Sequence, residues 1–155
     1  ISAMFAESVL GKFADKKDRF FKLRYLQYEW VRITMEQLRR EMWFQSGVIY
    51  WMINDCWPAS SGWSIIDYYN KPKDAYYAFK RCAKQMVISI ENKNGKLCVY
   101  ACNDALKSCD GKGLLYLYNC KNGEKSIEKS FCFNGNYSSY SGYFSSAFNY
   151  FCILY

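Results

Sequence analysis

Three tryptophans and two short polar residues stand close together in the first half of the chain. They are Trp51, Asn54, Asp55, Trp57 and Trp63. An indole face stacks on the apolar face of a ring such as a sugar, and it contributes binding without needing a charge. Asn and Asp side chains hydrogen-bond either to ligand hydroxyls or to the backbone of their own loop. The stretch therefore predicts a binding loop, with the alternative that the indoles only pack and the polar pair only caps the loop.

The elements around this stretch must position it. Apolar residues recur at roughly helical spacing over residues 15–44, which predicts a long helix. Residues 47–53 are apolar throughout, which is typical of a strand buried on both faces in a parallel sheet. A second helix is expected from Pro72, a favoured early position, to about Lys84. This barrel-like or doubly wound α/β pattern supplies one strand, so we expect the other strands to come from residues outside this chain.

The hydrophobic period changes near residue 86. Short alternating stretches are separated by turn residues such as Asn94-Gly95 and Asn122-Gly123, which are hairpin signals. Regular short strands of this kind predict an antiparallel β-sandwich. We therefore expect an α/β part over residues 1–86 and an all-β part over residues 87–155. The expected strands cover residues 86–91, 97–102, 114–120 and 126–133, with one or two more within 143–155 and loops at 103–113 and 134–142.

Several motifs follow one another in an order that carries a family resemblance. They read Trp-Met-Ile-Asn-Asp-Cys-Trp-Pro at 51–58, Gly-Trp-Ser-Ile-Ile-Asp-Tyr-Tyr at 62–69, Lys-Pro-Lys at 71–73, Tyr-Tyr at 76–77 and Lys-Arg at 80–81. Together they resemble the end of the catalytic barrel in glycoside hydrolase family 2 enzymes of the β-mannosidase type. Arg-Tyr-Leu-Gln at 24–27 resembles the preceding barrel helix, and Val-Tyr-Ala-Cys-Asn-Asp at 99–104 resembles an early strand of the following sandwich. The resemblance extends from residue 19 to about residue 120.

The resemblance implies the last helix–strand–helix portion of a (β/α)8 barrel, followed by an Ig-like β-sandwich. It implies a retaining exo-β-glycosidase, above all a β-mannosidase that removes terminal β-linked mannose. A β-galactosidase or an exo-β-glucosaminidase of the same family stays open. The implied partners are a β-mannoside oligosaccharide and the rest of the catalytic barrel upstream. The alternative from another class is a non-catalytic carbohydrate-binding or interaction module built on the sandwich.

The resemblance also assigns the site residues. The tryptophan that matches Trp51 forms part of the sugar-binding floor in the family. Asn54 and Asp55 follow it directly, in the loop at the C-terminal end of the strand, where barrel enzymes place their sites. Trp57 and Trp63 are expected to wall the entrance. All five are therefore expected to bind substrate. The alternative is that the tryptophans only pack and that Asn54 and Asp55 only cap the loop.

The catalytic carboxylates are not expected in this chain. A retaining glycosidase needs two carboxylates about 5 Å apart. In the family one follows Asn in an Asn-Glu pair and the other lies in a Ser-Glu-Phe-Gly setting, and neither pattern occurs here. Glu7 lacks the flanking pattern, Asp55 alone cannot fill both roles, and Asp67 is expected to organise the next helix or to pair with Arg24 or Lys71. We therefore expect no catalytic residue and no activity from this chain by itself.

Composition argues against several other functions. The net charge is +7, from 21 basic and 14 acidic residues. Because these charges do not gather into runs, we expect no nucleic-acid partner, although a basic binder stays a minor alternative. No apolar run is long enough to span a membrane, so no membrane partner is expected. With 20% aromatic residues, the chain has the material for a packed core.

The cysteines and the chain ends complete the sequence evidence. Eight cysteines allow disulfides, but the sequence lacks a CxxC pair, a histidine and a recognisable signal peptide. We therefore favour free, mostly buried thiols in a reducing cytoplasm, and we expect no metal and no cofactor. The chain opens on Ile1 and closes on an apolar stretch at 151–155, so we expect it to belong to a longer chain. Residues 136–155 depart from the family pattern.

Overall fold

The computed structural model describes residues 2–42, 44–59, 62–119, 121–135, 140–145 and 150–154. The chain divides into two compact units, Ile1–Lys84 and Gln85–Tyr155. The first unit is helical, and the second contains two three-stranded antiparallel sheets. No helix in the described ranges is both long enough and apolar enough to cross a membrane.

The first unit contains three helices, α1 Ala3–Leu10, α2 Lys16–Arg40 and α3 Asp74–Cys82. The long helix predicted over 15–44 is confirmed, but it ends at Arg40 rather than at residue 44. Its first turn is capped by Asp15, whose carboxylate accepts a hydrogen bond of 2.7 Å from the backbone N–H of Asp18. Arg39 and Arg40 lie in the last turn, where positive charge is favourable. The sequence interpretation did not include α1.

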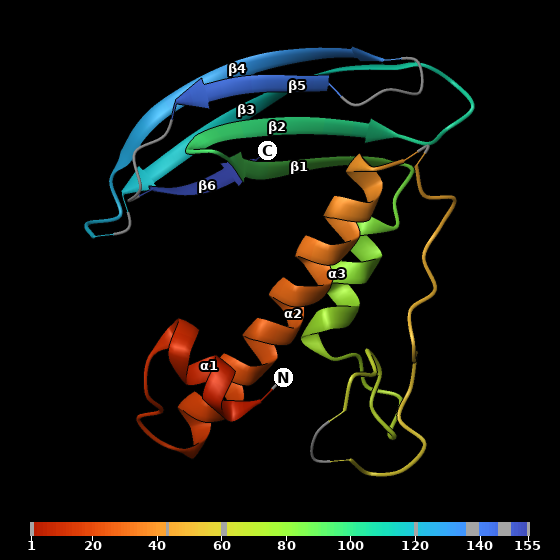
Figure 1. Ribbon diagram of the computed structural model, residues 1–155, viewed down its shortest axis with the longest axis vertical. Helices are drawn as coiled ribbons and strands as arrows, with labels where there is room; N and C mark the ends of the chain where they lie inside the picture. The colour runs from red at the N-terminus through yellow and green to blue at the C-terminus, as the bar shows by residue number, and fades with distance from the viewer. Residues whose placement is uncertain are drawn as a thin grey trace. The chain divides into compact units, whose positions relative to one another are not determined.

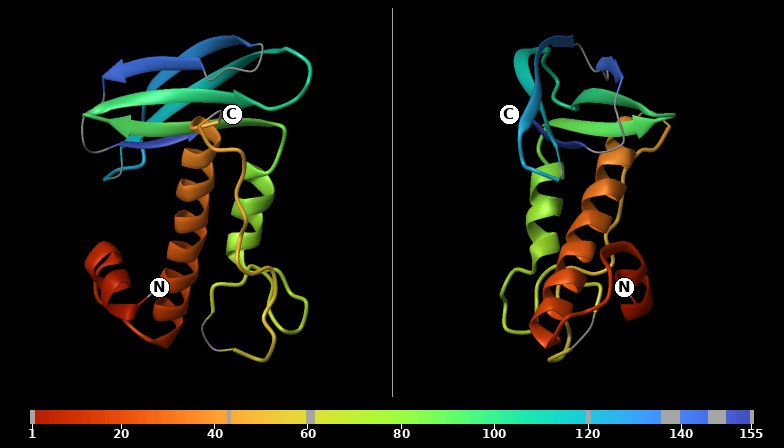
Figure 2. Two further views of the ribbon diagram at one scale, coloured as in Figure 1. Left: turned by 45° about the vertical axis from the view of Figure 1, so that its right-hand side comes forward. Right: turned by 90° about the vertical axis from the view of Figure 1, so that its left-hand side faces the viewer.

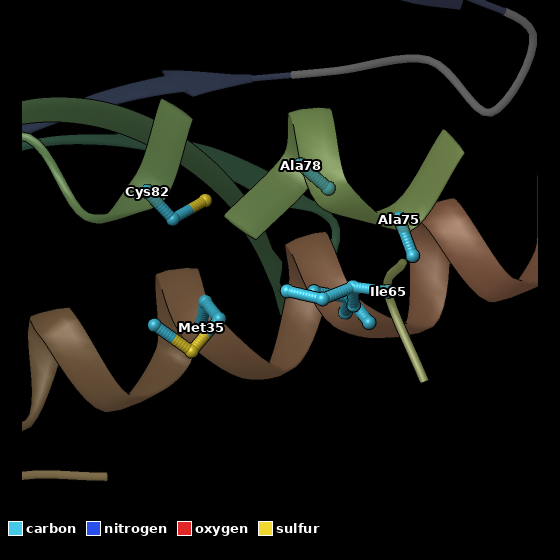
Figure 3. Packing of buried hydrophobic residues seen from close by; sticks show 6 residues of the cluster. Met35, Ile65, Ala75, Ala78 and Cys82 are labelled. Carbon is cyan, nitrogen blue, oxygen red and sulfur yellow. The ribbon is translucent and has the colours of Figure 1, made fainter. Parts of the chain in front are cut away.

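Helices α2 and α3 lie side by side and share the core of the first unit (Figures 1 and 2). Figure 3 shows Met35 of α2 opposite Cys82 of α3, with Ile65 packed beside Ala75 and Ala78. The small alanines let Ile65 and α2 come close to α3. Ile65 thereby fixes the chain segment that precedes α3 onto both helices.

Residues 47–53 do not form the buried strand expected from their sequence. This segment carries no strand, and Val48, Ile49, Trp51 and Ile53 are all exposed. The physical reason is that a strand buried on both faces needs a neighbouring strand on each side. No neighbouring parallel strand lies beside this segment among the described residues of the first unit. The side chains of Val48, Ile49, Trp51 and Ile53 are consequently left uncovered, whereas Tyr50 packs against the core of the first unit.

The second unit is formed by β1 Met86–Lys93, β2 Lys96–Asn103, β3 Cys109–Asn119, β4 Lys125–Gly135, β5 Tyr140–Ser145 and β6 Tyr150–Leu154. One sheet has the order β1-β2-β5 and the other β4-β3-β6, and these neighbouring strands pair antiparallel (Figure 1). The expected strands are thus present. The expected loop at 103–113 is shorter, because β3 already begins at Cys109. The loop expected at 134–142 is partly replaced by the ends of β4 and β5, and residues 136–139 lie outside the described residues.

Both sheets contribute to the core of the second unit, which contains Val99 and Ala101 of β2, Leu115 of β3, and Phe131 and Phe133 of β4. The hairpin between β1 and β2 turns at Asn94 and Gly95, which have positive φ values of 53° and 77°. This pair of conformations suits the Asn-Gly turn signal in the sequence.

The strands β3 and β4 meet through an unusual set of cross-strand pairs. Gly111 lies opposite Phe133, and Gly113 lies opposite Phe131. A Cβ atom added to Gly113 would lie 2.3 Å from Cζ of Phe131. Each ring therefore occupies the space above its glycine, and the glycines are needed to admit the rings into the core.

Candidate functional site

The candidate site lies on residues 51–59 and 62–66, named here the tryptophan loop. Its two limbs run side by side through a parallel bridge between Asn54 and Ile66. The backbone N–H groups of Ile65 and Ile66 donate to the carbonyl of Ile53 at 3.0 and 2.8 Å, and that of Asp55 donates to the carbonyl of Ile66 at 3.1 Å. The loop is therefore an ordered arrangement of short extended segments. Its peptide bond between Trp51 and Met52 is cis.

The three indoles of the loop are all exposed. Trp51 is 79% exposed, Trp57 64% and Trp63 70%. None of them packs in the core of the first unit, so packing alone does not account for them in this structure. Exposed indoles of this kind offer flat apolar faces for stacking against a ring. This is the placement expected of a binding loop.

Asp55, in contrast, is a buried residue of the loop. Its Oδ1 accepts a hydrogen bond of 2.5 Å from Oγ of Ser64, and its Oδ2 lies 2.7 Å from Nζ of Lys73. Nζ of Lys73 also donates to Oγ of Ser64 at 2.6 Å. Each of the three side chains is thus bonded to the other two, and Asp55, Ser64 and Lys73 are named here the loop network. These contacts agree with the alternative role of Asp55, in which it organises its own loop.

The loop network controls the charge of Asp55. The hydrogen bond from Lys73 holds the pKa of the Asp55 carboxyl below its ordinary value, and the hydrogen bond from Ser64 lowers it further. Burial opposes this shift, because a low dielectric disfavours the charged form. Asp55 is therefore a carboxylate at neutral pH, with its charge balanced by the ammonium of Lys73.

The remaining polar residues of the prediction lie at the surface. Asn54 is exposed, and its Nδ2 donates a long hydrogen bond of 3.4 Å to the carbonyl of Asp55. Oδ1 of Asp67 accepts hydrogen bonds from the backbone N–H groups of Tyr69 and Lys71, at 2.9 and 2.8 Å. Asp67 thus organises the turn before α3 and does not cap the helix itself, whose N-cap is Lys73.

The expected pairing of Arg24 with Asp67 is wrong. Arg24 instead binds Asp74, with 2.6 Å between Nη2 and Oδ1. The reason is that Asp74 lies in the first turn of α3, beside α2, whereas the carboxylate of Asp67 is occupied by the backbone of its own turn.

The sequence interpretation missed the residues that anchor the second limb of the loop. Oη of Tyr50 donates to the carbonyl of Trp63 at 2.5 Å. Nε2 of Gln27, on α2, donates to the carbonyl of Ser64 at 3.1 Å. Ser64 and Lys73, which lie within the motifs at 62–69 and 71–73, also belong to these anchoring residues. Their polar types within an apolar, tryptophan-rich stretch were the available signal, since buried polar groups need partners.

A second charged cluster lies between α2 and α3. Glu36 is buried and binds both Arg32 and Arg81, and Arg32 also binds Glu29 at 2.6 Å. Burial alone would lower the pKa of Arg32, but its contacts with Glu29 and Glu36 outweigh this effect and raise it. Glu36 and Asp55 are the buried carboxylates of the described residues, and both are held by basic side chains. This arrangement suits structural ion pairs.

The described residues contain no group of three or more His, Cys, Asp or Glu side chains placed to hold a metal ion. The tryptophan loop instead exposes three indoles, on segments joined by the loop network.

Comparison with known proteins identifies the relatives of this chain. No family model matches the sequence. β-Mannosidase B of Emericella nidulans is 42% identical over 48 residues, which are 31% of this chain and 6% of that enzyme. The β-D-mannosidase from Dictyoglomus thermophilum superposes with a TM-score of 0.71 at 32% identity, over 90% of this chain and 18% of that one. The chain is similar in sequence and in structure to β-mannosidases.

Two further proteins are similar to this chain. β-Mannosidase B of Thermothelomyces thermophilus is 47% identical over 47 residues, 30% of this chain and 5% of that enzyme. The exo-chitosanase of Amycolatopsis orientalis shares the fold, with a TM-score of 0.72 at 23% identity over 93% of this chain and 18% of that chain. The predicted resemblance to β-mannosidases of family 2 is thus confirmed. The chain spans only a small part of the length of each of these relatives.

Proposed function

We propose that this chain is part of a retaining exo-β-glycosidase, comprising the end of its catalytic (β/α)8 barrel and an Ig-like β-sandwich. Residues 1–86 are assigned to the barrel and residues 87–155 to the sandwich. The observation that carries the proposal is the 32% identity to the Dictyoglomus β-D-mannosidase over 90% of this chain. The element order of helices followed by two antiparallel sheets supports the same assignment.

The exposed segment 47–53 supports a barrel partner. Ile49 is 93% exposed and Ile53 59%, in a run of residues typical of a strand buried on both faces. Such apolar surface is rarely left in contact with water unless another surface covers it. In the proposed enzyme, the upstream strands of the barrel lie beside this segment and cover Val48, Ile49 and Ile53, while Trp51 faces the sugar.

The proposed substrate is an oligosaccharide with a terminal β-linked mannose. Trp51 would form part of the floor under the sugar ring, Trp57 and Trp63 would wall the entrance, and the exposed amide of Asn54 would hydrogen-bond to hydroxyls. Asp55 would contribute by holding the loop, since its oxygens are bonded to Ser64 and Lys73.

The proposed catalytic glutamates belong to the upstream part of the enzyme. Within the described residues, the two buried carboxylates are Asp55 and Glu36, and both are neutralised by Lys or Arg. Neither is free to serve as a nucleophile or as an acid/base group. We therefore propose that the chain by itself is inactive.

The family contains other sugar specificities. The exo-chitosanase shares the fold of this chain at a TM-score of 0.72. An exo-β-glucosaminidase, or a β-galactosidase, is therefore the competing assignment. The greater identity to the Dictyoglomus β-D-mannosidase favours mannose.

The experiment begins with the coding DNA upstream of Ile1. We expect an open frame that encodes an Asn-Glu pair and later a Ser-Glu-Phe-Gly-like segment. Its product should hydrolyse nitrophenyl β-mannoside with a kcat/KM about tenfold or more above that for the β-galactoside and β-glucosaminide, a difference of about 1.4 kcal/mol in transition-state binding. The matched control replaces the glutamate of the Asn-Glu pair by glutamine, which should abolish turnover.

Two results would contradict the proposal. A stop codon directly upstream would leave the chain without catalytic groups, and sugar binding by the exposed indoles would then favour a non-catalytic carbohydrate-binding module. A higher kcat/KM on either competing substrate would overturn the choice of mannose.

A further inference from the structure

We propose that Lys73 is a positioning residue for the tryptophan loop, acting through Asp55 and Ser64 to fix the two limbs that carry the indoles. The meaning of this role for sugar binding rests on the function proposed above. The positioning itself is a property of this chain and can be tested without sugar.

The geometry places Lys73 at the point where three segments converge. Asp55 belongs to the first limb of the loop, Ser64 to the second limb, and Lys73 to the segment directly before α3. Nζ of Lys73 lies 2.7 Å from Asp55 and 2.6 Å from Ser64. One ammonium group therefore bonds to both limbs at once.

Lys73 itself starts from a fixed position. Its backbone N–H donates to the carbonyl of Ile65 at 2.9 Å, and its carbonyl accepts from the N–H of Tyr76 at 3.0 Å in the first turn of α3. Ile65 is buried against α2 and α3. The side chain of Lys73 thus reaches the loop from a backbone that the helical core holds in place.

The indoles lie next to the anchored residues in sequence. Trp63 directly precedes Ser64, and Trp57 follows Asp55 by two positions. Gly62 adds a tight contact, because a Cβ at this position would lie 3.0 Å from Oδ1 of Asp55. A shift of Asp55 or Ser64 would therefore move the backbone that carries these indoles.

The Asp55 carboxylate depends on few side-chain donors. Among the contacts of the described residues, the Asp55 carboxylate receives side-chain hydrogen bonds from Lys73 and Ser64. Without the ammonium, a buried carboxylate keeps one hydroxyl donor, and it must take up a proton or turn toward water. Either response weakens the side-chain link between the two limbs and leaves them joined by the backbone hydrogen bonds of Ile53 and Asp55. The low pKa of the Asp55 carboxyl agrees with this dependence on Lys73.

The test uses the full 155-residue chain labelled with 5-fluorotryptophan and observed by fluorine NMR. Single Trp→Phe replacements assign the resonances of Trp51, Trp57 and Trp63, and Trp30 on α2 serves as an internal reference. The variant is Lys73→Met, which keeps most of the side-chain volume but removes the ammonium. The matched control is Lys71→Met, at an exposed lysine two residues earlier.

We expect Lys73→Met to shift or broaden the resonances of Trp57 and Trp63 while Trp30 stays in place. Amide hydrogen exchange in residues 53–66 should accelerate about tenfold or more, as expected for the loss of a charged hydrogen bond. Lys71→Met should change neither readout, and Lys73→Arg should restore both in part. Ser64→Ala provides a second variant that keeps both charges, with the same resonances expected to move by less.

Unchanged resonances of Trp57 and Trp63 in both Lys73→Met and Ser64→Ala would overturn the proposal. A titration of the unsubstituted chain with β-1,4-mannobiose separates this question from the function. Indole shifts that follow the Lys73 substitution, together with no response to mannobiose, would uphold the positioning role and count against the sugar-binding assignment.

Discussion

Glu36 of α2 accepts a hydrogen bond from Arg81 of α3, with 2.6 Å between Oε1 and Nη2, although the Glu36 side chain is only 2% exposed. Arg32, one turn earlier on α2, binds the other carboxylate oxygen at 2.8 Å. A buried carboxylate is thus neutralised by one guanidinium from each helix. The pair ties α2 to α3 beside the core that also holds Ile65, and so it supports the base of the tryptophan loop.

Arg81→Met should destabilise the first unit because it leaves a buried carboxylate with one cationic partner. We expect a loss of about 2 kcal/mol, below the range for fully buried pairs because Arg81 is half exposed. The measurement is urea denaturation followed by circular dichroism at 222 nm. Arg24→Met is the matched control, since Arg24 also joins α2 to α3 through Asp74 but is well exposed, and it should cost about 0.5 kcal/mol or less. Equal losses in the two variants would count against a special role for Glu36.

The low pKa of Asp55 predicts an acid-dependent loss of stability. A carboxyl whose folded-state pKa lies below its unfolded value of 3.8 stabilises the fold above that pH and loses this contribution as the pH falls through the folded-state pKa. The urea concentration at the midpoint of the helical signal should therefore decrease as the pH is lowered below 3.8. In Asp55→Asn, the midpoint should be lower at pH 6 and should decline less steeply with acid. Asp18, whose pKa Lys22 also lowers, is retained in both proteins and contributes equally to both curves. Parallel curves would show that Asp55 does not titrate with unfolding.

Gly113→Ala should destabilise the second unit. The new Cβ would lie 2.3 Å from Cζ of Phe131, a buried ring of the core, so the ring must move. Overpacking of this kind costs about 1–3 kcal/mol. Hydrogen exchange in residues 97–119 should accelerate, while Gly47→Ala, whose Cβ would meet no atom within 4 Å, should leave it unchanged. Unchanged exchange in Gly113→Ala would mean that the ring has room to turn away.

The described cysteines should differ sharply in reactivity. Burial, with a further contribution from Glu36, raises the pKa of the Cys82 thiol, whereas Cys56 is exposed on the tryptophan loop. Because the thiolate is the reacting species, Cys56 should be alkylated first by iodoacetamide at pH 8, and Cys82 about tenfold or more slowly. Peptide mapping by mass spectrometry at several time points measures both rates in one sample. Comparable rates at the two sites would contradict the burial of Cys82.

The sequence supported much of the second unit because its signals are local. The Asn-Gly turn at 94–95 adopts the positive φ values that its residue types favour, and the alternating stretches became strands. The pairing of β2 with β5 was not predictable, since partners far apart in sequence leave no local signal. The glycines at 111 and 113 had been assigned to a loop, because their need to admit Phe133 and Phe131 appears only once the strands are paired.

The tryptophan loop was predictable as a motif but not as a geometry. The three indoles were identified from their types, and their exposure follows from the placement of the loop. The commitment of Asp55 to Ser64 and Lys73 could not be foreseen, since it depends on three segments that meet only in the fold. The segment at 47–53 was predicted as a buried strand from its composition, but it forms no strand in the structure. A strand needs neighbouring strands, and the local sequence does not show whether these are present.

The central claim is that this chain contributes a sugar-binding surface to a β-mannosidase-type enzyme. The measurement that tests it most directly is kcat and KM on nitrophenyl β-mannoside for the product of the complete reading frame, compared with its Trp51→Ala variant. Trp30→Ala is the control, because Trp30 is also exposed but lies on α2 and packs edge-to-face against Phe5. We expect Trp51→Ala to lower kcat/KM about 30-fold, equivalent to about 2 kcal/mol of lost stacking, and Trp30→Ala to change it less than about twofold. Equal kcat/KM values for the unsubstituted enzyme and Trp51→Ala would contradict the claim.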